Sequence, residues 1–166
     1  MIHIYCGNGK GKTTAALGLA VRYAGTGNTV HIYQFMKGNP TSEIMSLEKL
    51  GIKVCRLSKD YGFSSQMTDA DRLKVTAEHN AMLDECMKDD CGLMILDEIF
   101  PAVNKGLADK EKALQVMYLL SHFQDIVLTG RDPAKEFLDG ADYITDMQCV
   151  RHPFQHGVKA RRGIEY

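Results

Sequence analysis

Tryptophan is missing from the 166 residues of this sequence, and neither sign of charge is in excess. Its 20 basic and 21 acidic residues give a formal net charge of −1, so no positive field surrounds the whole molecule to attract nucleic acid. Apolar runs are also short, and none approaches the ~18 residues that a membrane-spanning helix requires. We therefore expect a protein that binds neither nucleic acid nor membranes, and in which any anion site is local.

A Cys-x-x-Cys pair is also lacking, and the five cysteines lie at positions 6, 55, 86, 91 and 149. An odd number without a Cys-x-x-Cys pair is typical of reduced thiols in an intracellular protein. Cys86 and Cys91 could bind a metal ion with His79, but we interpret them as free thiols. The first strand-like segment begins at Met1 and leaves no room for a signal or transit peptide, so we expect a cytoplasmic protein.

Strand-like and helix-like segments alternate along the chain. We expect strands at residues 1–5, 29–35, 52–57, 91–96, 125–129 and 142–150. We expect helices at about residues 15–22, 41–50, 68–88 and 109–120, and a short one after Pro133. This alternation predicts an α/β fold with a doubly wound, mainly parallel sheet of about six strands and helices on both faces.

The remaining segments are expected to be loops, and the tail from Arg151 has neither helical nor strand periodicity. Since no linker or repeat interrupts the pattern, we expect residues 1–166 to form a single nucleotide-binding domain. Ligands of such sheets bind at the carboxyl ends of the strands. Five loops should therefore converge on one edge of the sheet, at residues 6–13, 36–43, 58–67, 97–104 and 129–133.

A glycine-rich loop follows the first strand and reads Cys6-Gly-Asn-Gly-Lys-Gly-Lys-Thr-Thr14. Strand, glycine-rich loop and helix N-terminus in this order form a polyphosphate cradle, with Lys12 near the β- and γ-phosphates and the Thr13 hydroxyl near Mg²⁺. The usual P-loop spacing would place its first glycine at position 6, which is cysteine, so the loop is one residue shorter than usual. The candidate phosphate-binding residues are Gly7, Asn8, Gly9, Lys10, Gly11, Lys12, Thr13 and Thr14.

A second nucleotide signal is the apolar strand that ends in Asp97-Glu98, where either acid could hold Mg²⁺ directly or through water. Glu98 could instead position a water for ATP hydrolysis. Asn104-Lys105-Gly106-Leu107 lacks the aspartate of the guanine-binding motif, so we expect no guanine specificity. His152 and His156 are separated by Pro153 in the irregular tail, and we do not expect them to bind a metal.

Several stretches together resemble the ATP:corrinoid adenosyltransferase family, over nearly the whole chain. They are the short P-loop Gly7 to Ala16, Gln34-Phe-Met-Lys-Gly38, Leu96-Asp-Glu98, Thr129-Gly-Arg131, and the tail Val150-Arg-His-Pro-Phe-Gln-His-Gly-Val-Lys-Ala160 with Gly163-Ile-Glu-Tyr166. The tail is the most specific of them. The resemblance implies a RecA-like P-loop fold and an enzyme that transfers the 5′-deoxyadenosyl group of ATP to the Co(I) of a reduced corrinoid, in adenosylcobalamin biosynthesis or salvage.

In that reaction the triphosphate of ATP leaves as one unit, and the corrinoid is cobalamin or cobyrinic acid a,c-diamide. The resemblance implies that residues 7–14 hold the departing triphosphate, that the nucleotide lies reversed relative to ordinary ATPases, and that Arg22 helps to place it. Thr13 with Asp97 or Glu98 would hold Mg²⁺, and Lys12, Glu98 and Phe63 are the candidate catalytic residues. No general base is needed because Co(I) is itself the nucleophile.

Phe63 resembles the family's aromatic residue that packs under the corrin ring and excludes the lower axial ligand. Ser65 stands where better-known members carry tryptophan, so this exclusion would depend on Phe63 with other residues. The chain also begins without the N-terminal extension of some relatives, which predicts a more open pocket or a different corrinoid preference. The family further implies a homodimer and an electron donor such as a flavodoxin or flavin reductase.

The residues by themselves leave other interpretations open. Phe63 could fill a hydrophobic gap, and Arg22 could be an ordinary surface charge. A P-loop kinase or ATPase would share the fold but release ADP without any corrinoid. A corrinoid carrier or nucleotide-gated binding module would bind the product tightly without turnover.

Overall fold

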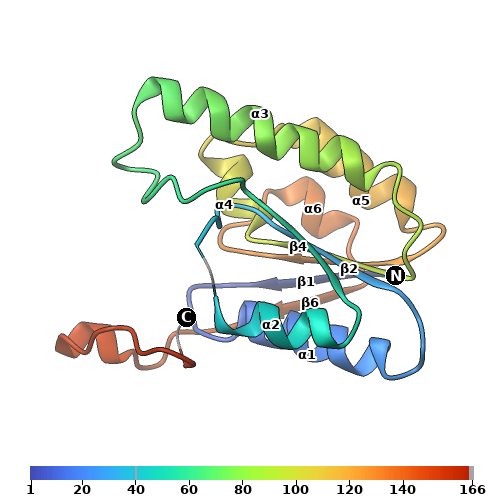
Figure 1. The fold of residues 1–166 in the computed structure, drawn as a ribbon, viewed down its shortest axis with the longest axis horizontal. Coiled ribbons are helices and arrows are strands. Elements are labelled where there is room, and N and C mark those ends of the chain that lie inside the picture. The colour runs from blue at the N-terminus through green and yellow to red at the C-terminus, as the bar shows by residue number, and fades with distance from the viewer. Residues whose placement is uncertain (40, 165–166) are drawn as a thin grey trace.

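The structure, a computed structural model, describes residues 1–39 and 41–164, so Pro40 in the second loop and Glu165-Tyr166 at the end of the tail lie outside the described residues. One sheet runs through the molecule (Figure 1). Its strands are β1 (Ile2–Cys6), β2 (Val30–Gln34), β3 (Lys53–Arg56), β4 (Leu93–Asp97), β5 (Asp125–Thr129) and β6 (Tyr143–Asp146). All of its pairings are parallel, in the order β3-β2-β4-β5-β1-β6, which confirms the predicted doubly wound, RecA-like P-loop architecture.

Helices cover both faces of the sheet, as Figure 1 shows. They are α1 (Lys12–Ala24), α2 (Ser42–Lys49), α3 (Asp69–Cys86), α4 (Ile99–Asn104), α5 (Lys110–Leu120) and α6 (Lys135–Asp139). Helices α1 and α2 lie on one face, and α3 to α6 lie on the other. No helix in the described part of the chain is both long and apolar enough to cross a membrane.

Strand β4 is the centre of the core because both of its faces are covered. All five of its residues are buried, as expected for an apolar strand in a parallel sheet. Leu93 and Ile95 pack in the cluster on the α1 face, whereas Met94 and Leu96 pack in the larger cluster beneath α3 and α5. Burial on both faces fixes the register of β4 and therefore the position of Asp97 at its end.

Three segments differ from the sequence-based expectation. Residues 99–104 form the short helix α4 rather than a loop, since Ile99 and Phe100 are buried and Pro101 falls in the first turn, where no intrahelical N–H bond is lost. The last strand ends at Asp146 instead of residue 150, because the chain then crosses the glycine-rich loop. One turn of 3₁₀ helix interrupts the tail at Pro153–His156.

Candidate active site

The glycine-rich loop between β1 and α1 is held against the chain that follows β6. Gly9 donates its backbone N–H to the Met147 carbonyl at 2.7 Å. A Cβ atom on Gly9 would lie 2.6 Å from that same oxygen, and one on Gly7 would lie 2.2 Å from Asp146 Oδ1. The two glycines are therefore required for close backbone packing, in addition to the role in phosphate binding that the sequence predicts.

Helix α1 opens directly onto this loop with an N-terminus suited to anions. Gly11 is the N-cap residue, with φ 117°, and no side chain caps the free N–H groups of the first turn. That turn also contains no acidic residue. Its first amides lack carbonyl partners within the helix and carry the positive end of the helix dipole. Lys12 curls back over the loop, where its Nζ donates to the Gly9 carbonyl at 2.8 Å, and burial lowers its pKa. These groups have the arrangement that the sequence predicts for a polyphosphate site, and their binding of phosphate stays a prediction.

Asp97, at the end of β4, is the hub of the site and is fully buried. Its Oδ1 accepts hydrogen bonds from the hydroxyls of Thr13 at 2.8 Å and Thr129 at 2.7 Å. Its Oδ2 accepts from Lys37 Nζ at 2.7 Å and from Gln34 Nε2 at 3.2 Å. Since four donors occupy the carboxylate, Asp97 is placed to orient Thr13 and Lys37, and its binding of Mg²⁺ stays a prediction.

Strand β5 lies between β1 and β4, so the P-loop and Asp97 are not carried by neighbouring strands. They meet because parallel strands end at the same edge of the sheet, and Thr129 at the end of β5 bridges the gap. Thr13 and Asp97 are thus brought together, and the magnesium site predicted at these residues stays a prediction.

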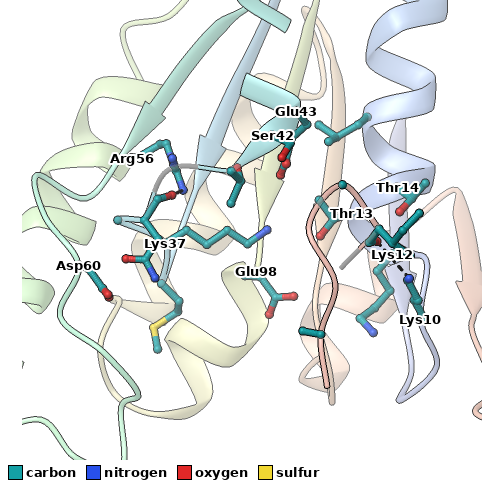
Figure 2. Close-up of a pocket in the computed structure, with 18 of the residues that line it drawn as sticks. Lys10, Lys12, Thr13, Thr14, Lys37, Ser42, Glu43, Arg56, Asp60 and Glu98 are labelled. Atoms are coloured by element: carbon teal, nitrogen blue, oxygen red, sulfur yellow. Dashed lines mark hydrogen bonds between the residues drawn. The ribbon is translucent and has the colours of Figure 1, made fainter. Parts of the chain in front are cut away.

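Glu98 follows in a backbone conformation that glutamate rarely adopts, with φ 59° in the left-handed region. Its N–H donates to Thr129 Oγ1 at 3.0 Å, which holds the turn in place before α4 begins. The carboxylate faces the space between Lys37 and the P-loop (Figure 2). Burial, and then the charge of Asp97, raise the pKa of Glu98.

A cavity of about 1040 Å³ extends from the P-loop across the carboxyl edge of the sheet. Its walls come from residues 10–14, 36–39 and 41–43, from Arg56 and Glu98, from the loop that carries Phe63, and from Ala160, Gly163 and Ile164 of the tail. Figure 2 shows the labelled residues of this wall. The Phe63 side chain is 79% exposed, so it fills no gap in the core. The cavity therefore offers a polar cradle and an accessible aromatic ring in one continuous space.

The remaining candidate residues take different positions. Lys10 lines the cavity, and its Nζ donates to the Ile164 carbonyl at 3.1 Å. Asn8 accepts a hydrogen bond from the Cys149 N–H at 3.1 Å and so ties the loop to the tail. Arg22 lies exposed in the last turn of α1 and is not part of the cavity wall, so the structure does not bring it to the P-loop.

Three polar residues of the site were missed as functional candidates in the sequence. Lys37 and Thr129 lie within stretches that carry the resemblance, and Arg56 ends β3. Each stands at or just after the carboxyl end of a strand, which is the signal that could have found them. Lys37 and Thr129 both contact Asp97, and Arg56 contacts Asn39. These contacts depend on distances across the sheet and are not visible in the sequence.

The thiols and histidines considered as metal ligands have other partners. All five cysteines are free. His79 is buried, with Nε2 accepting from the Met36 N–H at 3.0 Å and Nδ1 donating to the Leu107 carbonyl at 2.8 Å, so it cannot join Cys86 and Cys91 in a metal site. Burial lowers the pKa of His79 and keeps it neutral.

Within residues 1–39 and 41–164, His31, Asp89 and Cys91 are the cluster that could hold a metal ion, with donor atoms within 4.8 Å of one another. It lies at the opposite edge of the sheet from the P-loop, where β2 and β4 begin. Asp89 is already satisfied by His31 Nδ1 at 2.7 Å and by the Tyr33 hydroxyl at 2.6 Å. We interpret this cluster as a structural polar network.

Comparison with known proteins places these features in context. The family model described as ATP:corrinoid adenosyltransferase BtuR/CobO/CobP matches residues 1–166. The corrinoid adenosyltransferase CobA of Salmonella typhimurium is 33% identical over 170 residues, covering 100% of this chain and 85% of that protein, and the corrinoid adenosyltransferase of Escherichia coli K12 gives the same values. That of Pseudomonas aeruginosa is 31% identical over 166 residues, covering 98% of this chain and 82% of its own. The similarity therefore includes the tail as well as the phosphate cradle.

Proposed function

The chain belongs to the ATP:corrinoid adenosyltransferase family, and from this membership we propose that its cavity holds ATP against a corrinoid reduced to the Co(I) state. The protein is an ATP:corrinoid adenosyltransferase, an enzyme that moves the 5′-deoxyadenosyl group of ATP onto the corrinoid cobalt and so takes part in adenosylcobalamin formation. The observation that supports the placement of ATP next to the corrinoid is the continuity of the cavity. The cavity joins the polyphosphate cradle to the exposed ring of Phe63.

The reaction needs alignment more than acid–base chemistry. The electron pair of Co(I) attacks the 5′-carbon of ATP and forms a Co–C bond. The bond between the 5′-carbon and the oxygen of the α-phosphate breaks, and the triphosphate leaves with the electron pair of that broken C–O bond. Positioning of this kind can contribute roughly 7–11 kcal/mol when the attack geometry is good. In this proposal the α1 amides and Lys12 neutralise the negative charge that develops on the leaving triphosphate, and so stabilise the transition state.

We propose that Mg²⁺ accompanies the triphosphate, held by Thr13 and Glu98. The donor set fits, because hydroxyl and carboxylate oxygens are the ligands Mg²⁺ prefers. The Thr13 proton is committed to Asp97, which leaves the hydroxyl lone pairs for a cation. A bound Mg²⁺ would neutralise part of the triphosphate charge, and Asp97 would act on it only through Thr13.

Further parts of the proposal concern surroundings and partners. We propose that Phe63 packs under the corrin ring, since it is an exposed aromatic side chain in the cavity wall. Five free thiols support a reducing, cytoplasmic location.

The need for Co(I) supports an electron donor of flavodoxin or flavin-reductase type. Residues 1–166 would act as one domain, as a homodimer.

The test is the identity of the phosphate product under anaerobic reduction. ATP with reduced cobalamin should give a light-sensitive alkylcobalt product and one equivalent of tripolyphosphate. Lys12→Ala should abolish this turnover, because it removes the cation of the cradle. Release of orthophosphate or pyrophosphate as the stoichiometric product would overturn the leaving-group assignment, and ADP formation without corrinoid would indicate an ATPase.

A further inference from the structure

The wall of the cavity farthest from the P-loop contains polar groups that lack partners. Arg56, at the end of β3, donates from Nη2 to the Asn39 carbonyl. Its Nε is buried without a hydrogen-bond partner among the described residues, and so is the hydroxyl oxygen of Thr41. Both residues line the cavity. Figure 2 shows Arg56 on the same side as Lys37, across the cavity from the P-loop.

The charge of Arg56 is also not neutralised by an ion pair in the parts of the chain that the structure describes. Lys37 on the same wall pairs with Asp97 at 2.7 Å, whereas among residues 1–39 and 41–164 no carboxylate lies within ion-pair distance of Arg56. Burial lowers the pKa of Arg56, and the charge of Glu43 opposes that effect without a direct contact. A half-buried guanidinium in the wall of the same cavity as an unpartnered hydroxyl suits an anion, because arginine presents its donors in a fork that matches a carboxylate.

The triphosphate of ATP is not the anion that this position suits. Strand β3 is separated from β1 by four strand spacings in the sheet order, which is roughly 19 Å at the usual spacing of parallel strands. The triphosphate has its own cradle at the β1 end, built from α1 and Lys12. The second substrate offers another anion, because corrinoids such as cobyrinic acid a,c-diamide carry free carboxylates where cobalamin carries amides.

We propose that Arg56, with Thr41, binds a free peripheral carboxylate of the corrinoid, so that this enzyme favours incompletely amidated corrinoids. The inference rests on the proposed function of the cavity. An amide can offer Arg56 a carbonyl oxygen but no charge. Hydrogen bonds between charged groups stabilise a complex more than neutral ones do. Arg56 should therefore discriminate between the two corrinoids through their binding affinity and not through the rate of the chemical step.

The experiment compares wild type, Arg56→Gln and the matched control Arg72→Gln. The Arg72 guanidinium likewise donates to a backbone carbonyl, that of Lys105, at 2.8 Å, but it lies outside the cavity wall. Each protein is assayed with Co(I) forms of cobyrinic acid a,c-diamide and cobalamin. Arg56→Gln should raise KM for the carboxylate substrate roughly tenfold to a hundredfold and KM for cobalamin by less than about threefold. The kcat values and KM for ATP should not change, Arg56→Lys should recover part of the loss, and Arg72→Gln should match wild type.

Each other outcome is decisive. Equal losses on both corrinoids, or no loss on either, would overturn the carboxylate assignment, and a raised KM for ATP would assign Arg56 to the nucleotide instead. If Arg56→Gln does not fold, Thr41→Val must produce a smaller selective loss on the carboxylate substrate, and an unselective effect overturns the proposal. Failure of wild type to adenosylate either corrinoid would refute the proposed function itself, which is a separate result.

Discussion

The buried pair of Asp97 and Lys37 should control the stability of the site. Asp97 is fully buried, whereas the Lys37 side chain keeps 26% of its exposure on the cavity side. Asp97→Asn removes the negative charge and leaves Lys37 without its ion-pair partner. It also places the amide nitrogen of the new asparagine against Lys37 Nζ and Gln34 Nε2, the two donors that bond to Oδ2 in the wild type. Breaking one side of a buried pair typically costs about 3–5 kcal/mol.

Two features of the site reduce that figure. Lys37 can turn into the cavity and recover hydration, since it is partly exposed. Gln34 can flip its amide and present Oε1, which has no partner among the described residues, to the new amide of the variant. We therefore expect Asp97→Asn to lower the free energy of unfolding by about 2–3 kcal/mol, and Tm by roughly 4–12 °C for a chain of this size.

A double-mutant cycle with Lys37→Met isolates the pair. Urea unfolding of both single variants and the double variant should give a coupling of about 1–2 kcal/mol, because the second mutation removes the stranded charge. The exposed pair of Lys53 and Glu85 is the control, and Lys53→Met should change stability by at most ~1 kcal/mol. Additivity of Asp97→Asn and Lys37→Met within about 0.5 kcal/mol would refute the reasoning.

Three further predictions follow from single contacts. A Cβ on Gly38 would lie 1.8 Å from the Lys59 carbonyl oxygen, so Gly38→Ala should lower kcat/KM by tenfold to about a hundredfold in the adenosylation assay, and an unchanged value would contradict this. Burial lowers the pKa of His79 in the folded protein, so below pH ~6.5 this histidine binds a proton more readily in the unfolded chain than in the folded one. The free energy of unfolding of the wild type should therefore fall by up to ~1.4 kcal/mol for each pH unit of acidification in that range. Urea unfolding of His79→Gln at several pH values should lack that contribution. Phe63→Ala should leave stability within about 0.5 kcal/mol yet slow turnover from Co(II) more than from Co(I), and equal slowing would remove its proposed role.

The elements that could be predicted from the sequence are those with strong local patterns. The apolar run of β4 is long enough to indicate a buried strand, and its two terminal acids mark the edge of the site. Helix α4 could not be predicted because its six residues are too short to show a period and include Pro101. Its helical state is decided by burial of Ile99 and Phe100 in the core, which depends on the tertiary structure.

Strand order and the contacts across it are a different kind of information. The sequence of residues 125–129 does not indicate that β5 lies between β1 and β4, because strand order is determined by long-range crossover connections. The bridge from Thr129 to Asp97 and the pair between Lys37 and Asp97 both depend on that order. The P-loop and the acidic strand end were therefore predictable as parts, but the hub that joins them was not.

The short glycine-rich loop acquires a second explanation from the structure. The loop is held against the chain after β6 by two hydrogen bonds, from the Gly9 N–H to the Met147 carbonyl and from the Cys149 N–H to Asn8 Oδ1. The chain that follows returns to the same loop, where the Ile164 carbonyl accepts a hydrogen bond from Lys10. Ala160, Gly163 and Ile164 complete the cavity wall. The chain that closes the cavity is thus anchored at both ends to the residues proposed to hold the triphosphate. A substitution that moves the loop must therefore move the tail, so phosphate affinity and cavity shape should respond together.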